Sequence, residues 1–282
     1  MEGIQRNSGT IEGVRGPMLW DVHLPERMKA LAVYAHGISG FKDWGGMNEV
    51  AKAFADRGIG FVKFNYSCNG TSPEFPLDFV HLDRFREDNY VTRQEELRRV
   101  HAFVSSQWKR KEIPLILIGH SRGGADVLLH TAENEGIDAV ITWASPSNFQ
   151  TPWSRWDQDC LRHWEVEGVV YVKNGRTGQD MPIGHQLREE YLKHSSRLDM
   201  PKVTNTVSVP WLILHGTEDE AVPLSQAQEL SDWSDGKADQ VEIEGAGHTF
   251  GRRHPWEEDH LPRQTDELIA TSCDWIEVVL KR

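Results

Sequence analysis

The sequence contains little cysteine and no long apolar run, and both absences narrow the kinds of protein that it can encode. Cys68, Cys160 and Cys273 are widely spaced along 282 residues and form no CxxC pair, which argues against a disulfide framework or a cysteine zinc site. No window approaches the roughly 18 apolar residues of a membrane-spanning helix, and the first residues lack the apolar core of a secretory signal. We therefore expect a cytoplasmic protein that does not bind a membrane.

Basic residues are also too few to balance the acidic ones. The chain has 31 Lys and Arg against 43 Asp and Glu, which gives a net charge of −12. Nucleic acid repels such a protein, so it is not expected as a partner. The basic cluster Lys109-Arg110-Lys111 falls where we expect a helix to end, and there it complements the helix dipole.

Short apolar runs alternate with longer amphipathic stretches, as a parallel sheet with crossover helices requires. Buried strands are predicted at 30–35, 59–66, 113–118, 139–143, 211–215 and 241–243. Helices are predicted at 47–56, 89–108 and 261–280, with another from the glycines at 123–124 to about 134. Residues 10–24 are expected to add an antiparallel hairpin at the sheet edge, and 67–87 to form a loop. The run at 113–118 is the most hydrophobic, so it should be a central strand.

One connection, residues 146–205 between the sixth and seventh strands, is too long for a simple loop between a strand and a helix. We predict a single domain of residues 1–282 in which 146–205 form a small cap insertion over the carboxyl edge of the sheet. The segment contains Trp153, Trp156 and Trp164. These tryptophans either line a substrate pocket or pack the cap onto the domain, and the sequence leaves both interpretations open.

The strongest motif is Gly119-x-Ser121-x-Gly123, directly after the most hydrophobic strand and directly before a helix. A nucleophile on a sharp strand-to-helix turn has a strained backbone and needs small neighbours. The N-terminus of the following helix also favours developing negative charge. The motif therefore predicts that Ser121 is a catalytic nucleophile.

A serine nucleophile needs a base, and in this arrangement an acid and then a histidine follow later strands. Asp219 lies just after the strand at 211–215 and fits a G-x-x-D-x-x-V-P spacing, although Glu218 and Glu220 flank it. His248 follows the last strand on a glycine-rich turn. We predict that His248 is the base and that Asp219 orients it.

Two backbone N–H groups are predicted to form an oxyanion hole. One belongs to Arg122, directly after the nucleophile, and the other to Ile38, in the loop after the strand at 30–35. The Arg122 side chain either reaches a substrate carboxylate or pairs with an acidic group, and pairing is favoured. His36, His120 and His215 are interpreted as structural hydrogen-bonding residues.

The order His36-Gly37, Gly119–Gly124, Asp219 and Gly247-His248 resembles the α/β-hydrolase superfamily from about residue 30 to the end of the chain. The stretch at 36–44 (HGISGFKDW) and the modest cap are similar to bacterial serine esterases related to cinnamoyl and feruloyl esterases. The resemblance implies an α/β-hydrolase fold, with a mostly parallel central sheet and helices on both faces. It also implies a small-molecule carboxylic ester as substrate, with a short-chain or aromatic acyl group, and an acyl-enzyme mechanism that uses no metal or organic cofactor.

Several alternatives stay open at this point. Thioesters, amides and C–C bonds β to a carbonyl can be cleaved by the same three residues. A serine at the turn excludes the nucleophilic aspartate of dehalogenases and epoxide hydrolases, and nothing resembles the long apolar lid of a triacylglycerol lipase. A non-catalytic binding protein on the same fold is the alternative from another class, although such proteins often lack one of the three residues.

Overall fold

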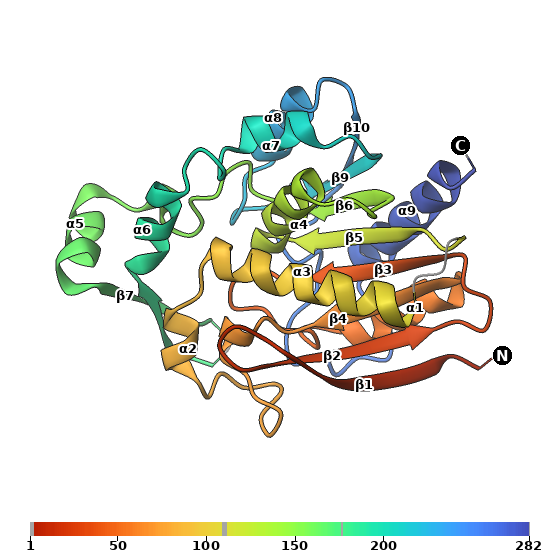
Figure 1. The fold of residues 1–282 in the computed structure, drawn as a ribbon, viewed down its shortest axis with the longest axis horizontal. Coiled ribbons are helices and arrows are strands. Elements are labelled where there is room, and N and C mark those ends of the chain that lie inside the picture. Colours follow the sequence, from red (N-terminus) through yellow and green to blue (C-terminus); the bar gives the residue numbers. More distant parts are fainter. Residues whose placement is uncertain (1–2, 109–111, 176, 282) are drawn as a thin grey trace.

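An eight-stranded sheet forms the centre of the molecule, in the order β1-β2-β4-β3-β5-β6-β9-β10 (Figure 1). The computed structural model describes residues 3–108, 112–175 and 177–281, so the basic cluster at 109–111 lies outside the described residues. The strands are β1 (Gln5–Glu12), β2 (Pro17–Leu24), β3 (Ala30–Ala35), β4 (Ile59–Phe64), β5 (Leu115–His120), β6 (Ala139–Trp143), β9 (Trp211–Gly216) and β10 (Ala238–Ile243). The pairings β1–β2 and β2–β4 are antiparallel, and the others are parallel.

Helices cover both faces of the sheet, as the sequence predicts. One face carries α3 (Tyr90–Gln107), α4 (Arg122–Glu133), α7 (Met200–Thr206) and α8 (Ser225–Trp233), and the other carries α1 (Met47–Asp56) and α9 (Arg263–Val279). Successive strand residues point to opposite faces. In β3, Leu31 and Val33 therefore belong to one buried cluster, and Ala32 and Tyr34 to the other.

Most predicted elements are confirmed, several with shifted ends. The strands at 30–35 and 139–143 and the helix at 47–56 agree with the prediction to the residue. The central strand runs from 115 to 120 because its ladder with β6 continues through Gly119 and His120. The prediction of a loop at 67–87 is wrong in part, since it contains the short helices η1 (Ser67–Asn69) and α2 (Leu82–Arg86). The sequence also missed α8.

The long connection between β6 and β9 has elements of its own. It contains η2 (Trp153–Arg155), α5 (Gln158–Glu167), β7 (Val169–Lys173), β8 (Asp180–Gly184), α6 (Gln186–Lys193) and α7. β7 and β8 form a separate antiparallel hairpin. Figure 1 shows α5, α6 and β7 beyond the carboxyl ends of β3 and β5. The role of residues 146–205 as a cap stays a prediction.

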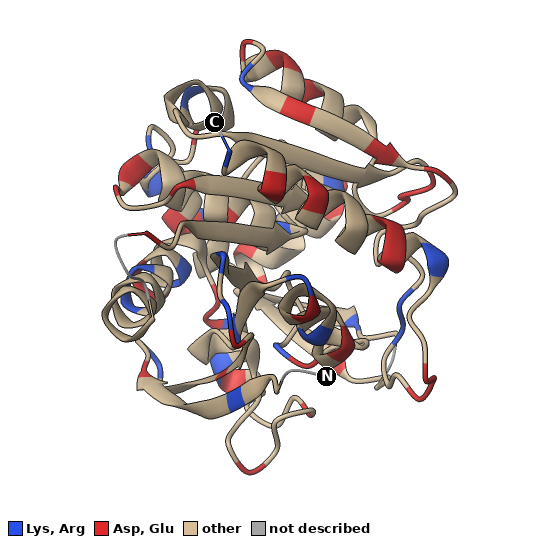
Figure 2. Ribbon diagram, turned by 90° about the vertical axis from the view of Figure 1, so that its right-hand side faces the viewer, with Lys and Arg blue, Asp and Glu red and all other residues tan. Residues whose placement is uncertain are grey.

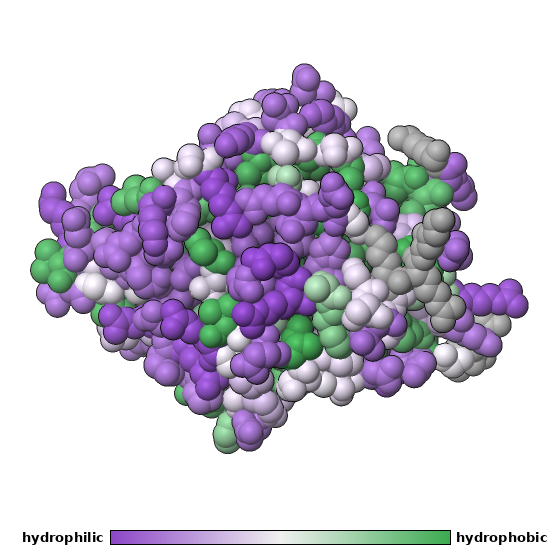
Figure 3. All heavy atoms as spheres, in the orientation of Figure 1, coloured by the Kyte–Doolittle hydropathy of each residue, from purple (hydrophilic) through white to green (hydrophobic). Residues whose placement is uncertain are grey.

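The surface is polar on the face that Figure 3 presents, where hydrophilic residues surround small separate apolar groups. Acidic and basic positions are interspersed along the ribbon in Figure 2. Within the described ranges, none of the helices combines the length and apolar character needed to cross a membrane.

Candidate active site

Ser121 lies on the sharp turn between β5 and α4. Its backbone has φ 55° and ψ −130°, a conformation that a residue with a side chain adopts only under strain. A Cβ atom on Gly119 would lie 2.2 Å from the carbonyl oxygen of Gly123, and one on Gly123 would lie 2.2 Å from that of Ala35. The turn therefore accommodates only glycine at these two positions unless the backbone moves.

The structure brings Ser121, His248 and Asp219 together, although they lie far apart in the sequence. Ser121 Oγ is 2.9 Å from His248 Nε2, and His248 Nδ1 is 2.8 Å from Asp219 Oδ2. Glu218 and Glu220, the two acidic neighbours, are exposed, whereas Asp219 is buried. Asp219 is therefore the acidic residue of this loop that contacts the histidine.

The carboxylate of Asp219 has partners on both oxygens. Oδ1 accepts hydrogen bonds from the backbone N–H groups of Ala221 and Val222, at 2.9 and 2.8 Å. Burial opposes its ionisation, but the hydrogen bonds from His215 and His248 and the charge of His248 outweigh burial and hold its pKa below the usual range. The carboxylate is therefore ionised and fixed in direction beside His248.

Two further histidines hold this region in place, as predicted. His120 Nε2 donates to the backbone carbonyl of His248 at 2.8 Å, and His215 Nε2 donates to that of Val222 at 2.8 Å. Burial, followed by the charges of His248 and Arg252, lowers the pKa of His120 well below its ordinary value. His120 is therefore a neutral donor that positions the loop carrying His248.

The two segments predicted to supply oxyanion donors lie against each other. A Cβ atom on Gly37 would meet Ser121 Cβ at 2.9 Å, so the loop that contains Ile38 packs directly onto the turn that carries Ser121. Arg122 is the first residue of α4, and the N–H of a first helical residue has no acceptor within its helix. His36 makes the structural contact expected of it: Nδ1 donates to the carbonyl oxygen of Gly37 at 2.8 Å.

A compact group of four charges anchors the continuation of this loop. Lys42 Nζ contacts the carboxylates of Asp21, on β2, and Asp43, while Lys63 Nζ, on β4, contacts the same two carboxylates. The Lys63 side chain is fully buried and the other three are at most 15% exposed. Charges this well paired and this little exposed fix geometry more than exposed pairs do. The segment at 38–44 is therefore held to the edge of the parallel strands.

A cavity of about 540 Å³ opens beside Ser121 and His248. Part of its wall is apolar and is formed by Ile38, Phe41, Trp44, Val172, Met181 and Val222. Sequence reasoning did not name Phe41 and Trp44, yet both fall in the stretch at 36–44 that carried the family resemblance. The resemblance at 36–44 was therefore the feature of the sequence that could have pointed to these two residues of the cavity wall.

Trp153, Trp156 and Trp164, for which the sequence left two interpretations open, lie outside the described wall of this cavity. They pack on one another, with ring centroids of Trp164 5.7 Å from Trp153 and 5.0 Å from Trp156. Trp164 is fully buried, and its Nε1 donates to the backbone carbonyl of Ile183. Their amphipathic rings serve the packing of the insertion, which is the second interpretation that the sequence left open.

The side chain of Arg122 pairs with an acidic group, as favoured from the sequence. Nη1 lies 3.2 Å from Asp88 Oδ2, and the guanidinium lies over the ring of Tyr90, 4.2 Å from its centroid. The side chain is fully buried and is absent from the cavity wall that the described residues form. In the described part of the chain, no group of three or more His, Cys, Asp and Glu residues is arranged to hold a metal ion.

Comparisons with known proteins agree with this architecture. The sequence matches the alpha/beta hydrolase family over residues 32–260. No curated protein matches it.

The solved structures with a similar fold include the three that follow. The esterase domain of a Rhodothermus marinus protein has a TM-score of 0.64 and 21% identity, and the match covers 96% of this chain and 98% of that one. Est1E from Butyrivibrio proteoclasticus, with ferulic acid bound, has a TM-score of 0.68 and 15% identity over 97% and 100% of the two chains. An alpha-beta serine hydrolase homologue from Coxiella burnetii has a TM-score of 0.61 and 17% identity over 96% and 97%. At these identities the likeness extends to the fold alone.

Proposed function

Because the chain belongs to the alpha/beta hydrolase family, we propose that it is a serine hydrolase that cleaves carboxylic esters. The observation that carries the proposal is the row of two hydrogen bonds from Ser121 Oγ to His248 and from His248 to Asp219. Such a row converts a weak hydroxyl nucleophile into an effective one. The fold and the family that the sequence implied are confirmed, and the reaction is our proposal.

The proposed reaction has two halves. Ser121 Oγ attacks the ester carbonyl carbon while its proton passes to His248 Nε2, and the resulting oxyanion accepts hydrogen bonds from the N–H groups of Ile38 and Arg122. When the C–O bond to the leaving group breaks, His248 returns the proton to the departing alcohol. Water then attacks the acyl-enzyme with His248 again as base, which releases the acid and restores Ser121. Asp219 stays ionised and orients the ring.

We propose a short-chain or aromatic acyl group for the substrate. The cavity of about 540 Å³ falls within the range of small-molecule pockets, which are mostly apolar with a few placed polar groups. Phe41 and Trp44 supply aromatic surface in its wall. Est1E, whose fold is similar, was solved with an aromatic acid bound, which supports the aromatic alternative.

Residues 146–205 are proposed as the cap that limits the size of the acyl group. Thr151, Pro152 and Arg155, around η2, contribute to the cavity wall, as do Val172 and Met181 on the β7–β8 hairpin. The insertion therefore closes part of the space beside the nucleophile. Thioesters, amides and C–C bonds remain alternative substrates because the same row of residues serves each of them.

A fluorophosphonate probe and a substrate panel test the proposal. The wild-type protein should be labelled and should hydrolyse p-nitrophenyl acetate or methyl ferulate faster than an acyl thioester or an anilide. Ser121→Ala should abolish both labelling and hydrolysis, whereas Ser106→Ala, a change at an exposed serine of α3, should affect neither. Failure of the folded wild-type protein to react with the probe would contradict the enzyme proposal in favour of a binding protein. A thioester or amide as the best substrate would overturn the ester assignment.

A further inference from the structure

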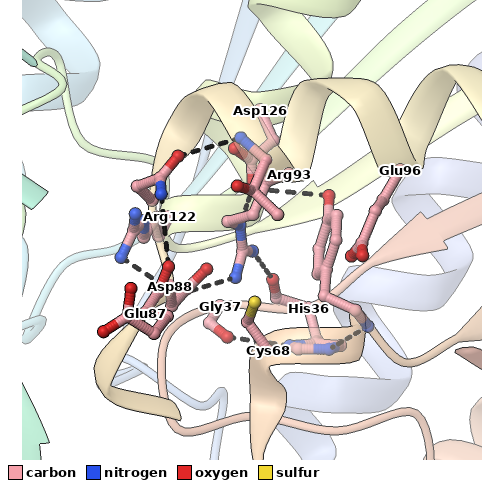
Figure 4. A network of polar contacts seen from close by, with 12 residues as sticks. His36, Gly37, Cys68, Glu87, Asp88, Arg93, Glu96, Arg122 and Asp126 are labelled. Carbon is pink, nitrogen blue, oxygen red and sulfur yellow. Dashed lines mark hydrogen bonds and ion pairs between the residues drawn. The ribbon is translucent and has the colours of Figure 1, made fainter. Parts of the chain in front are cut away.

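Four charged side chains form a buried group behind the nucleophile turn (Figure 4). They are Asp88, Arg93, Arg122 and Asp126, and each residue is at most 8% exposed. None of them is among the described residues of the cavity wall, so none is placed to touch a substrate there. Charged residues are seldom buried so completely unless they are paired. Their contacts show what this group holds in place.

Arg93, on α3, binds the loop that contains Ile38. Its Nη2 donates to the backbone carbonyl of His36 at 2.6 Å, and its Nε donates to Asp126 Oδ2 at 2.7 Å. The guanidinium also lies over the ring of Tyr66, 3.8 Å from its centroid, and the backbone N–H of Tyr66 donates to His36 Nε2 at 3.3 Å. The planar guanidinium of Arg93 thus fixes the carbonyl of His36 directly and also packs on Tyr66, whose backbone N–H binds the His36 ring.

His36 passes this constraint to the predicted oxyanion donor. Its Nδ1 donates to the carbonyl oxygen of Gly37, which also accepts a hydrogen bond from the N–H of Gly40 at 3.3 Å. In a trans peptide the C=O and N–H groups point in opposite directions. Fixing the Gly37 carbonyl therefore fixes the direction of the Ile38 N–H. Burial first, and then the charge of Arg93, lower the pKa of His36 to about 3, so its ring is neutral near pH 7.

Asp88 links this loop to the other predicted donor. Its Oδ2 accepts a hydrogen bond from Arg122 Nη1 at 3.2 Å and lies 3.5 Å from Arg93 Nη1. Arg122 itself supplies the second backbone N–H at the start of α4. One carboxylate oxygen thus contacts both arginines. Arg93 binds the loop that contains the Ile38 donor, and the backbone N–H of Arg122 is the other predicted donor.

Resting on the proposed function, we propose that Arg93 is a positioning residue of the oxyanion hole. It sets the direction of the Ile38 N–H through His36. Asp88, which contacts both arginines, fixes the position of Arg93 relative to Arg122. A lysine at this position keeps the charge but donates from a single nitrogen, so it does not reproduce the planar fork that spans the His36 carbonyl and Asp126. Asp126 and Asp88 outweigh burial and raise the pKa of Arg93, so the group keeps its charge throughout the assay range.

Two variants test the proposal. Arg93→Leu/Asp126→Leu removes the contact to His36 together with the buried countercharge, so that no unpaired charge remains from this pair. Arg93→Lys keeps the charge and carries the test if the double variant does not fold. The matched control is Arg197→Leu/Glu133→Leu, which removes an arginine–carboxylate pair of 2.6 and 2.7 Å on the outer side of α4.

Hydrogen exchange reports on the loop without reference to activity. The N–H groups of Gly40 and Tyr66 bond to Gly37 and His36, so their exchange should accelerate in both Arg93 variants and stay unchanged in the control. Unchanged exchange at both amides in a folded Arg93 variant would overturn the proposal. This measurement decides the matter even if the wild-type protein hydrolyses no ester, in which case the proposed function fails by itself.

Kinetics test whether the constraint serves the transition state. With p-nitrophenyl acetate, kcat of the double variant should fall by about 10²-fold while KM changes by less than about twofold, as expected when an oxyanion donor is misdirected. Binding of a trifluoromethyl ketone, which forms an oxyanion adduct with the serine, should weaken in parallel. Inhibition by the product acid should not change, because ground-state binding does not use the constraint. A lower kcat with unchanged ketone affinity would also overturn the proposal. A general loss of structure would not weaken ketone binding while leaving inhibition by the product acid unchanged.

Discussion

Asp219 Oδ2 lies between two imidazole rings, 2.8 Å from His248 Nδ1 and 3.4 Å from His215 Nε2. Because Oδ1 is occupied by the N–H groups of Ala221 and Val222, the carboxylate has a single orientation. His215 in turn donates to the carbonyl of Val222, which closes a small ring of contacts around the loop. The acid beside His248 is thus held from four directions.

Replacing this acid should cost far more activity than replacing its neighbours. Asp219→Asn should lower kcat for p-nitrophenyl acetate by about 10³- to 10⁴-fold, because an amide that keeps both backbone contacts presents its NH₂ to His248 and favours the wrong tautomer. Glu218→Gln and Glu220→Gln are matched controls, since both side chains are exposed, and they should change kcat by less than about twofold. A large fall in kcat on replacing either glutamate, or a small fall for Asp219→Asn, would show that Asp219 is not the acid that orients His248.

The tryptophans of the insertion should govern stability, and the wall tryptophan should govern binding. Trp164→Phe removes buried volume and the hydrogen bond to Ile183, so it should lower the free energy of unfolding by about 1–3 kcal/mol and leave KM unchanged. Trp44→Ala, in the cavity wall, should raise KM with a smaller effect on stability. Urea unfolding and steady-state kinetics of both variants check this pair. Exchanged roles, with Trp164→Phe raising KM, would restore the pocket interpretation of the insertion.

Short acyl chains should be cleaved faster than long ones. The cavity of about 540 Å³ and the small insertion beside it leave little room for an extended chain. We expect kcat/KM to be higher for p-nitrophenyl acetate and butyrate than for laurate and palmitate, each corrected for the rate with Ser121→Ala. Rates that rise through laurate to palmitate would contradict both the size limit and the proposed role of residues 146–205.

Acid should destabilise the fold because buried histidines stay neutral in the folded state. The pKa of His36 is lowered to about 3 by burial and then by Arg93, and that of His130 to about 3 by burial and then by His101 and Arg98. In the unfolded chain both rings take up protons near pH 6.5, so the unfolded form binds more protons and the free energy of unfolding falls as the pH drops from about 6.5 towards about 3. For His36 alone the loss between pH 6.5 and 4.5 is about 2 kcal/mol.

Urea unfolding between pH 7.5 and 4.5 measures this loss. His130→Gln removes one of these groups, so the stability of the variant should depend less steeply on pH over the same interval. A free energy of unfolding that stays constant down to pH 4.5 in the wild-type protein would contradict this prediction.

The sequence predicts the buried strands better than the edges. Residues 30–35 and 139–143 are continuous apolar runs inside a sheet covered on both faces, and such runs have clear ends. β10 begins three residues earlier than predicted because the edge segment Ala238–Gln240 is polar and only half-buried or exposed, which hides it from an apolar search. α8 and α5 were missed for a related reason, since each buries only one or two side chains.

In the candidate site, too, some residues could be predicted from the sequence and others could not. Ser121, His248 and Asp219 could be named because motifs and strand order place them at one edge of the sheet. Arg93 and Asp126 carry no such signal, because a charged residue on an amphipathic helix ordinarily faces solvent, and Asp88 lies in the short loop before α3 with no motif around it. Their importance depends on contacts between α3, α4 and a distant loop, which no local pattern encodes.

Directed evolution of this chain will meet very different tolerance at neighbouring positions of the site. Cavity-wall residues such as Trp44 and Val172 leave open space beside them, so libraries at these positions can redirect specificity. Gly119 and Gly123 carry no chemistry, yet a single added carbon at either would lie 2.2 Å from a carbonyl oxygen. In a saturation library selected for activity, these two glycines should be as depleted of substitutions as the nucleophile. These two glycines should therefore tolerate fewer substitutions than the residues of the cavity wall.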